Sequence, residues 1–403
     1  MNEWIIYKLK DLCSDIIDCI NKTAPISQEE TPYKMLRTSD VRDGRINLEG
    51  LNSVTETVFE TWTRRGKLNV GDIVFTREAP LGEVGLVRVA DNYFLGQRLV
   101  LFRANPEVCD NKFLLYSLLH HDNKQAIISK GVGSTVLHLR VPECENITIK
   151  APKLSIQKRI GEILSTYDDL IANNQKQIKL LEEAAQRLYK EWFIDLHFPG
   201  HENCKIVDGV PEGWSKYQFS EKVDVMSGGT PKTSNPHYYN GEIPFYTPKD
   251  STEDFFSFDT ITKITEEGVL NSNTKVYPIN TVIITARGTV GKITILAKPM
   301  AMNQSCYALK SDELNTPYYL YFSLKQEINK LQAMANGGVF DTIIIKTFDS
   351  ISITIPNESI LIMFNEKISP IMEQIKTKMI GNFRLQEARD RLLPKLMSGE
   401  IEL

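Results

Sequence analysis

The sequence has few of the residues that build metal sites or disulfide frameworks, and it lacks any long apolar run. Six histidines and six cysteines occur among 403 residues. The cysteines are scattered without a C-x-x-C pair, which excludes a recognisable zinc site or disulfide framework and fits a reducing cytoplasm. The histidines lack H-E-x-x-H spacing. No apolar run reaches 18 residues, so no membrane span is expected, and the first residues do not follow the plan of a secretory signal.

The sequence also lacks an excess of charge of either sign. The formal net charge is −4, and residues 1–150 carry 19 basic against 20 acidic groups. Residues 201–355 carry 14 basic and 17 acidic groups. A nucleic-acid-binding protein often has a basic balance. Any phosphate-binding surface of this chain must therefore arise from local clustering.

The chain contains an internal repeat with a period of about 205 residues. Residues 152–188 align without a gap to residues 356–392 when they are shifted by 204 positions. The preceding segments align with a drifting offset, as loop insertions produce. The aligned pairs are Trp4 with Trp214, Asp40 with Asp250, Thr76 with Thr285, Gly82 with Gly291, Gln97 with Gln304, and Leu115-Tyr116 with Leu320-Tyr321.

The repeat predicts four segments in the order A–B–A′–B′, with boundaries at 1–150, 151–200, 201–355 and 356–403. Segments A and A′ contain short β-branched runs such as VGDIVFT and TVIITA, separated by Gly, Pro, Asn and Asp. Such runs indicate strands, and short helices are expected near residues 111–130 and 316–335. The predicted fold class is α+β: two similar mixed α/β domains.

Segments B and B′ are predicted to be long helices. Apolar residues in B recur at alternating steps of four and three, which is a heptad pattern, and Asn174 is its one polar member. Neither helix can bury such a stripe alone, so we expect an antiparallel coiled-coil pair that gives the repeat a pseudo-twofold character; a plain core helix is the alternative. The predicted helix-pairing residues are Ile160, Leu164, Tyr167, Ile171, Asn174, Ile178, Leu181, Leu188, Phe364, Ile368, Ile375 and Leu385.

Several motifs in this order resemble the specificity (S) subunits of type I restriction–modification systems. In A′ they are PEGW at 211–214, SGGTP at 227–231 and TPKD at 247–250. RGTVG at 287–291 and REAPLG at 77–82 resemble two forms of the next family motif. LLEEA at 180–184 resembles the spacer helix, and RLLPKLMSGEI at 391–401 resembles the closing segment. The likeness extends over essentially the whole chain.

The resemblance implies two DNA target-recognition domains that together read a split, asymmetric site. It also implies partners: two methyltransferase (M) subunits and the restriction–translocase (R) subunits. The partners would supply the sites for S-adenosylmethionine, ATP and magnesium, so this chain itself is expected to hold no cofactor, metal or catalytic residue. Segment A departs from the pattern, because Asn21–Pro25 and Arg37–Asp40 stand where A′ has SGGTP and TPKD.

Base reading requires side-chain donors and acceptors that reach the major groove, together with groups that contact phosphates. Arg can grip guanine through two hydrogen bonds, and Gln or Asn can grip adenine. Polar residues of the glycine-bearing loops are therefore the candidates, with solvated loop residues as the alternative. The candidates are Arg77, Gln97, Arg98, Ser134 and Thr135 in A, and Thr230, Lys232, Lys249, Arg287, Asn303, Gln304 and Ser305 in A′.

Two other functions remain open at this stage. Asn235-Pro236-His237-Tyr238 resembles the N-P-P-Y motif of DNA adenine methyltransferases, although His237 replaces the second Pro and no glycine-rich cofactor loop follows a strand. The chain could also be a coiled-coil scaffold that never touches DNA. GTVGK at 288–292 ends like a phosphate-binding loop but lacks its first Gly and its final Ser or Thr, so a tight turn between strands is expected there.

Overall fold

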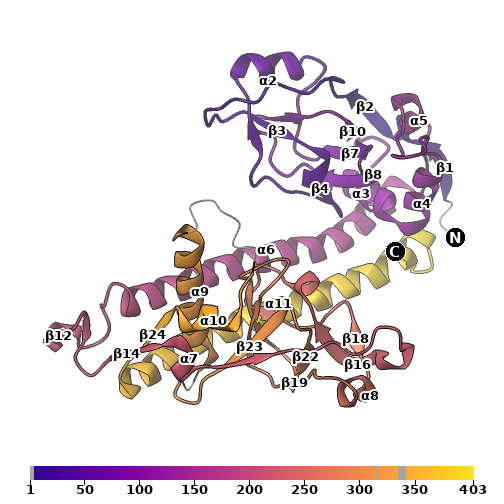
Figure 1. The fold of residues 1–403 in the computed structure, drawn as a ribbon. Coiled ribbons are helices and arrows are strands. Elements are labelled where there is room, and N and C mark those ends of the chain that lie inside the picture. The colour runs from indigo at the N-terminus through magenta and orange to yellow at the C-terminus, as the bar shows by residue number, and fades with distance from the viewer. Residues whose placement is uncertain (1–3, 315, 335–341) are drawn as a thin grey trace. The chain divides into compact units, whose positions relative to one another are not determined.

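The chain is described here by a computed structural model that covers residues 4–314, 316–334 and 342–403. It divides into two compact units (Figure 1). Unit 1 comprises Met1–Asn173 and Gly381–Leu403, and unit 2 comprises Asn174–Ile380. Each unit therefore contains one contiguous mixed α/β segment and a part of both long helices.

The strands of unit 1 form a four-stranded sheet, a three-stranded sheet and two strand pairs. The larger sheet has the order β2-β10-β7-β8, and the smaller one has the order β6-β3-β9, with β3 and β9 parallel. Their bounds are β1 Ile5–Lys8, β2 Cys13–Asp18, β3 Lys34–Leu36, β4 Val41–Arg42, β5 Arg45–Ile46, β6 Asn52–Ser53, β7 Ile73–Arg77, β8 Leu81–Leu86, β9 Tyr93–Leu95, β10 Leu99–Ala104 and β11 Thr148–Ala151.

Helices cover the larger sheet of unit 1, where α3 packs against β8. The short helices expected near residues 111–130 are α3 and α4, which break at His120 because its ψ of 133° is not helical. The remaining helices are short, and α1 and α5 contribute buried residues to the core. The bounds are α1 Leu9–Leu12, the 3-10 turn η1 Thr38–Asp40, α2 Glu56–Trp62, α3 Asn111–Leu119, α4 His121–Ser129 and α5 Val141–Glu145.

Unit 2 repeats this arrangement with one more strand in each main sheet. The larger sheet has the order β15-β23-β20-β21-β17, and the other has the order β18-β16-β22-β19, with β16 and β22 parallel. The bounds are β12 Ile206–Val207, β13 Val210–Pro211, β14 Ser215–Gln218, β15 Asp224–Ser227, β16 Tyr239–Tyr246, β17 Phe256–Ser257, β18 Lys263–Ile264, β19 Val276–Tyr277, β20 Val282–Thr285, β21 Ile293–Leu296, β22 Met300–Met302, β23 Cys306–Lys310 and β24 Ser352–Ile355.

The shorter helices of unit 2 include α9, the helix expected near residues 316–335, which packs against β20, β21 and β24. The others are single turns or short helices that join the strands. The bounds are η2 His201–Asn203, α7 Phe219–Lys222, η3 Pro236–Tyr238, η4 Pro248–Asp250, α8 Glu266–Leu270, α9 Pro317–Met334 and α10 Ile345–Asp349.

The internal repeat is present in the strand pairing. The antiparallel pair β1–β11 in unit 1 has its counterpart in β14–β24 of unit 2. The sheet order β2-β10-β7-β8 corresponds to β15-β23-β20-β21, and the parallel pair β3–β9 corresponds to β16–β22. The fold class predicted from the sequence, two similar mixed α/β domains with two long helices, is therefore confirmed.

The two long helices are α6, Leu154–Phe193, and α11, Glu358–Ser398. In unit 1, Asp168 of α6 is bonded to Arg389 of α11. Ile160, earlier in α6, shares an apolar cluster with Leu396, later in α11. This order of contacts makes the two helices antiparallel within the unit.

Unit 2 shows the same direction from the other ends of the helices. Tyr189 and Trp192, late in α6, lie 6.3 and 6.0 Å in ring-centroid distance from Phe364, early in α11. Ile375 and Met379 extend the cluster along α11. The predicted helix-pairing residues are all buried or half-buried, including Asn174, and their individual pairing roles stay a prediction.

Close packing of α6 on unit 1 depends on a helical glycine. A Cβ on Gly161 would lie 2.5 Å from Asp110 Oδ1 and 3.0 Å from the backbone nitrogen of Phe113. Nearby, the buried side chain of Gln157 accepts from the Asp110 N–H and donates to the carbonyls of Val108 and Pro152. The start of α6 is therefore held against the beginning of α3 by both shape and hydrogen bonds.

Truncation of Phe364 tests how much unit 2 depends on its aromatic cluster. Phe364 is fully buried among aromatic rings, so Phe364→Ala should lower the free energy of unfolding by about 3–5 kcal/mol. Urea unfolding monitored by tryptophan fluorescence gives the value. Leu180→Ala, at a position of α6 that is 64% exposed, is the control and should change it by less than about 0.5 kcal/mol. Equal effects of the two variants would contradict the assignment.

Candidate nucleic-acid interface

Four loops that are distant in the sequence of unit 2 are joined by hydrogen bonds. They contain the motifs singled out in the sequence, at residues 227–231, 247–250, 286–291 and 302–305. Each loop follows or precedes a strand of the two main sheets, so the strand pairing brings the loops to one region. Backbone bonds then fix three of the junctions: Gly229 N to Met302 O at 3.1 Å, Ala286 N to Ser305 O at 2.7 Å, and Asn303 N to Tyr246 O at 3.0 Å.

The SGGTP motif needs its first glycine because the neighbouring loop passes directly over it. A Cβ on Gly228 would lie 2.3 Å from the carbonyl oxygen of Asn303 and 2.4 Å from that of Met302. This approach brings the exposed side chain of Thr230 to Gln304, to which its hydroxyl donates a hydrogen bond. The motif therefore places a hydroxyl and a carboxamide side by side at the surface.

The third loop is fixed from below by a buried threonine. The Thr285 hydroxyl accepts from the Lys292 N–H at 3.0 Å and donates to the Thr289 carbonyl. The Thr289 hydroxyl in turn donates to the carbonyl of Pro248, in the TPKD loop, at 3.2 Å and lies 2.7 Å from the hydroxyl of Ser251. The turn that presents Arg287 is thereby tied to the turn that presents Lys249.

Unit 1 holds its loops with the same set of bonds. The Thr76 hydroxyl accepts from the Glu83 N–H at 2.9 Å, as Thr285 does from Lys292. Arg77 N donates to Arg98 O at 2.9 Å, as Ala286 does to Ser305. The equivalence of Thr76 with Thr285, aligned from sequence alone, is therefore reproduced in the structure.

The side chains at the top of the unit 1 loops also match those of unit 2. Thr23 donates to Gln97 Oε1 at 3.2 Å, in the place of Thr230 and Gln304, and Gln97 donates to Asn21 Oδ1 at 3.3 Å. The aligned glutamines therefore occupy equivalent positions. Because Asn21 adds a carboxamide that SGGTP lacks, the two surfaces have the same frame but different donors and acceptors.

Two aspartates organise the RTSD and TPKD loops, a role that the sequence analysis did not assign. Asp40 accepts from the Arg37 backbone N–H at 2.8 Å, and Asp250 accepts from the Thr247 N–H at 2.9 Å. Asp250 additionally accepts from the Ile261 N–H at 2.7 Å. The alignment of Asp40 with Asp250 was the available signal, since an acidic residue three positions after the cap can accept from the backbone N–H of the cap residue, as in a capping box.

Most of the candidate DNA-contacting residues are exposed at these loops. Arg98 lies next to Gln97 with a backbone φ of +72° and is 3.4 Å from Glu78. Ser134 and Thr135 lie in a loop between Val132 and His138. His138 forms β-bridges with Val132 and with Glu78. The exposed candidates are Arg98, Ser134, Thr135, Thr230, Lys232, Lys249, Arg287 and Gln304, and the half-buried ones are Arg77, Gln97, Asn303 and Ser305.

Arg77 differs from the other candidates because its guanidinium is engaged inside the protein. One terminal nitrogen lies 3.1 Å from Asp18, and the other donates to the Leu139 carbonyl at 3.2 Å. Its side chain is 15% exposed. In this conformation Arg77 positions the loops, whereas its counterpart Arg287, one residue further from the strand, is exposed.

The methyltransferase-like motif at 235–238 and the GTVGK motif at 288–292 adopt ordinary turn structures. Asn235 caps η3 by accepting from the His237 N–H at 3.2 Å, and Thr265 donates to the Tyr238 carbonyl at 3.0 Å. The GTVGK segment joins the antiparallel strands β20 and β21, as expected, and its Lys292 pairs with Glu253. Both motifs are thus accounted for by local hydrogen bonding.

Cysteine thiols and metal-binding side chains would be the sources of an alternative chemistry. Burial raises the pKa of Cys144 and Cys306 to about 12, so these thiols are protonated at neutral pH. Across residues 4–314, 316–334 and 342–403, no group of three or more His, Cys, Asp or Glu side chains is placed to hold a metal ion. No helix in the described part of the chain is long and apolar enough to cross a membrane.

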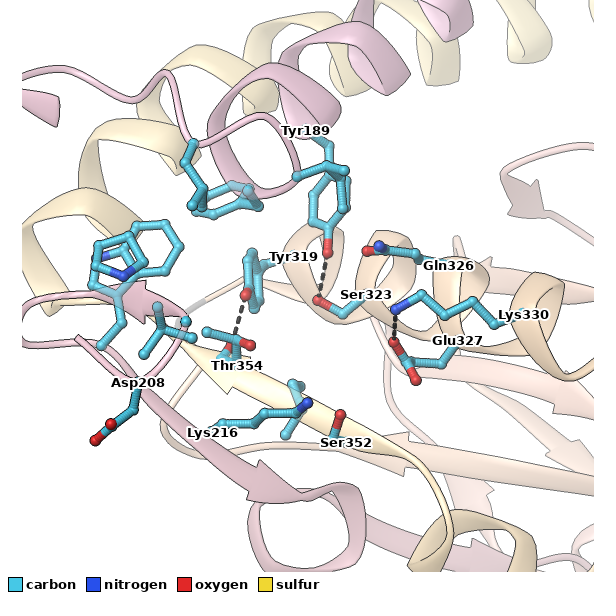
Figure 2. A pocket seen from close by; sticks show the side chains of 18 residues that line it. Tyr189, Asp208, Lys216, Tyr319, Ser323, Gln326, Glu327, Lys330, Ser352 and Thr354 are labelled. Atoms are coloured by element: carbon cyan, nitrogen blue, oxygen red, sulfur yellow. Dashed lines mark hydrogen bonds and ion pairs between the residues drawn. The ribbon is translucent and has the colours of Figure 1, made fainter. Parts of the chain in front are cut away.

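Unit 2 also contains a pocket of about 380 Å³, distinct from the loop surface (Figure 2). Tyr189 and Ser323 face each other at 3.0 Å, and the Tyr319 hydroxyl donates to the Thr354 carbonyl at 2.5 Å. Glu327, at the side of the pocket, pairs with a neighbouring lysine of α9. None of the DNA-contacting candidates lines this pocket.

A family model described as the type I restriction modification DNA specificity domain matches residues 1–183 and 211–385. The chain belongs to this specificity family. The model matches twice, once for each half of the internal repeat, and each match contains one set of the hydrogen-bonded loops described above.

Individual members of the specificity family are similar to this chain over most of its length. The HindI specificity subunit of Haemophilus influenzae is 24% identical over 379 residues, covering 77% of this chain and 82% of that protein. The MjaVIII specificity subunit of Methanocaldococcus jannaschii is 24% identical over 418 residues, covering 100% and 93%. A crystal structure of a type I S subunit from M. genitalium has the same fold, with a TM-score of 0.60, 16% identity and coverage of 98% and 96%.

Removal of the buried threonine hydroxyls should loosen the loops of both units. Thr285→Val leaves the Lys292 N–H without its acceptor, so the free energy of unfolding should fall by about 1–3 kcal/mol. Thr76→Val should have a similar effect in unit 1. Thr166→Val, at an exposed helical position, is the control and should be within about 0.5 kcal/mol of the wild type. A Thr285→Val variant with the same free energy of unfolding as the wild type in chemical denaturation would contradict this account of the loop.

The stability of unit 2 should depend on pH through Glu182. Burial, with Asp254 nearby, raises the pKa of Glu182 from 4.5 to about 7. The folded state therefore binds a proton in a range where the unfolded state has released it, and stability is lost as pH rises from about 4.5 to about 7. Glu182→Gln removes this loss, so its melting temperature should gain on that of the wild type over this range. Glu183→Gln, at the exposed neighbouring position, should follow the wild type; a constant difference for Glu182→Gln would contradict the shift.

Proposed function

We propose that the chain is the DNA-reading subunit of a type I restriction–modification complex and that each half of the repeat reads one half-site. The observation that carries the proposal is the doubled loop surface. In both units the same kind of hydrogen bond holds the loops, whereas the side chains exposed on the loops differ. A shared frame can place both surfaces against DNA in related ways. Different donors and acceptors then select different bases. The target is accordingly bipartite and asymmetric.

In this proposal the four predicted segments have separate tasks. Residues 1–150 and 201–355 are the target-recognition domains, and residues 151–200 and 356–403 are the spacers. Helices α6 and α11 contain 40 and 41 residues, which corresponds to about 60 Å each at 1.5 Å per residue. A rod of set length determines how many base pairs separate the two half-sites, in the way that dimer geometry sets half-site spacing.

The catalytic work belongs to other subunits in this proposal. Two M subunits bind through the exposed faces of the long helices and methylate adenines at the recognised site, and R subunits add ATP-dependent translocation and cleavage. These partners contribute S-adenosylmethionine, ATP and magnesium sites, and the complex acts in the cytoplasm. This chain contributes sequence selection, through interactions that depend on salt because phosphates are neutralised.

Both units contribute contact residues to the DNA surface in this proposal. Unit 1 presents donors from Gln97, Arg98, Ser134 and Thr135, and Arg77 holds the loops in place. In unit 2 the exposed cations contact phosphates or guanines, and the Thr230–Gln304 pair, with the adjacent Asn303 and Ser305, reads base edges. The cations of unit 2 are Lys232, Lys249 and Arg287.

A self-sufficient methyltransferase is the rival that a simple binding experiment separates. We expect the isolated chain not to bind S-adenosylmethionine in isothermal titration calorimetry, because Asn235 is used as a turn cap. Methylome sequencing of the host then tests the main proposal. A split adenine-methylated motif should disappear when the gene for this chain is deleted and should reappear when the chain is supplied. Persistence of all motifs in the deletion strain would refute the proposal.

Exchange of residues 1–150 with those of another specificity subunit tests the division of labour between the halves. One half of the methylated motif should change, while the other half and the number of unread base pairs stay the same. The reciprocal exchange of residues 201–355 should change only the other half. A change of both halves by either exchange would contradict separate readers.

A single cation tests whether the loop surface of unit 2 meets DNA. Arg287→Ala should cost about 1–3 kcal/mol of binding to the methylated motif if Arg287 reads a base. Fluorescence anisotropy with the M-containing complex at fixed salt measures the loss. Lys216→Ala removes an exposed cation of β14, away from the four loops, and should leave affinity within a factor of two of the wild type, or about 0.4 kcal/mol. Equal losses in the two variants would indicate only nonspecific charge.

A further inference from the structure

A buried aspartate joins the α/β body of unit 1 to both long helices. Asp168 of α6 is 8% exposed. One of its oxygens accepts from the hydroxyl of Tyr116 in α3, and the other lies 2.5 Å from Arg389 of α11. Arg45 of β5 approaches the same carboxylate at 3.5 Å. Two groups from the reading body and one from α11 therefore converge on one carboxylate of α6.

The partners of Asp168 fix the direction of its carboxylate. Burial, together with Asp168, raises the pKa of Tyr116, so the phenol keeps its proton and donates a hydrogen bond to the carboxylate. The Arg389 guanidinium also contacts Asp390 at 2.8 Å. Hydrogen bonds of this kind have strict angular requirements, in contrast to apolar contacts, which tolerate sliding and rotation.

At the equivalent helix positions unit 2 has apolar residues in place of the ion pair. The repeat offset of 204 places Met372 at the position of Asp168 and Ala185 at that of Arg389, and both are fully buried. The counterpart of Tyr116 is Tyr321, which packs on Phe255 at 4.7 Å and Phe322 at 5.3 Å. Since apolar residues occupy these two helix positions in unit 2, an ion pair at this place is not required for helix packing as such.

The energetics of buried charge sharpen the question of why the network exists. Taking two ions out of water costs free energy that their attraction regains only when the geometry is good, so an apolar replacement is often as stable. In several proteins a buried polar or ionic group instead specifies one arrangement among several of similar energy. The asymmetry between the units therefore points to orientation rather than stability.

We propose that Asp168 is a positioning residue that sets the orientation of the N-terminal reading body on the two helices and thereby the number of base pairs tolerated between the half-sites. The proposal rests on the proposed function of the chain. Tyr116 and Arg45 transmit the position of the body, and Arg389 transmits that of α11. Loss of the network leaves the reader folded but free to shift on the helices, so sites with a wrong gap become acceptable.

The chain offers a matched control one residue away. Asp169 pairs with Arg88 at 2.6 Å, so it also joins α6 to the α/β body. Its side chain is 53% exposed and that of Arg88 is 50% exposed. Because an exposed pair of this kind contributes little, Asp169→Asn reports the effect of changing a charge at this location without disturbing the buried network.

The test measures methylation by the complex of the chain with its M subunits on DNA duplexes that differ only in gap length. Asp168→Asn and Tyr116→Phe should each raise the rate on sites one base pair too long or too short, relative to the correct site, by about tenfold, since a displacement of about 1 Å can change rates by that order or more. Asp169→Asn should keep the gap preference of the wild type. Tyr116→Phe removes a single hydroxyl and serves as the second variant if Asp168→Asn does not fold.

The outcomes separate positioning from simple destabilisation. A parallel fall of the rates at all gap lengths, an unchanged gap preference in both variants, or an equal change in Asp169→Asn would overturn the proposal. Absence of methylation with the wild-type chain would instead refute the proposed function. Hydrogen exchange on the full chain tests whether Asp168 holds the α/β body on the helices. Asp168→Asn should speed exchange in α3 and β5 more than Asp169→Asn does, and equal exchange in the two variants would overturn the proposal.

Discussion

A long amphipathic helix that is apolar along one stripe must bury that stripe against something, and this constraint governs the architecture. α6 and α11 each supply residues to the cores of both units, Ile160 and Leu396 in unit 1 and Tyr189 and Phe364 in unit 2. The α/β segments in turn complete those cores. The duplicated sequence makes this economical, because one kind of body fits one kind of helix twice.

Above the shared frame the two units differ in the side chains that we propose read DNA. The threonines at 76 and 285 and the aspartates at 40 and 250 hold the loops through the same backbone groups. Such bonds depend on backbone conformation and tolerate changes of the side chains they do not use. A surface built in this way can come to recognise different DNA bases without a change of fold, which is what a family of specificity proteins requires.

The junctions between body and helices show the reverse situation, with a similar fold and different chemistry. Asp168 and Arg389 occupy in unit 1 the places that Met372 and Ala185 occupy in unit 2. Apolar residues fill these positions in unit 2, whereas in unit 1 we propose that the ion-pair network adds direction. The two halves of the repeat have thus diverged not only in the loops that face outward but also in how each body is joined to the helices.

The sequence by itself determined the repeat, the two mixed α/β bodies and the two long helices, because periodicity and internal alignment are local properties of the chain. It also identified the loops. It did not show that Arg77 turns inward to Asp18 while Arg287 is exposed, nor that Asp168 is joined to Tyr116 and Arg389. Those facts belong to the tertiary structure, because the direction of a side chain depends on partners that lie far away in the sequence.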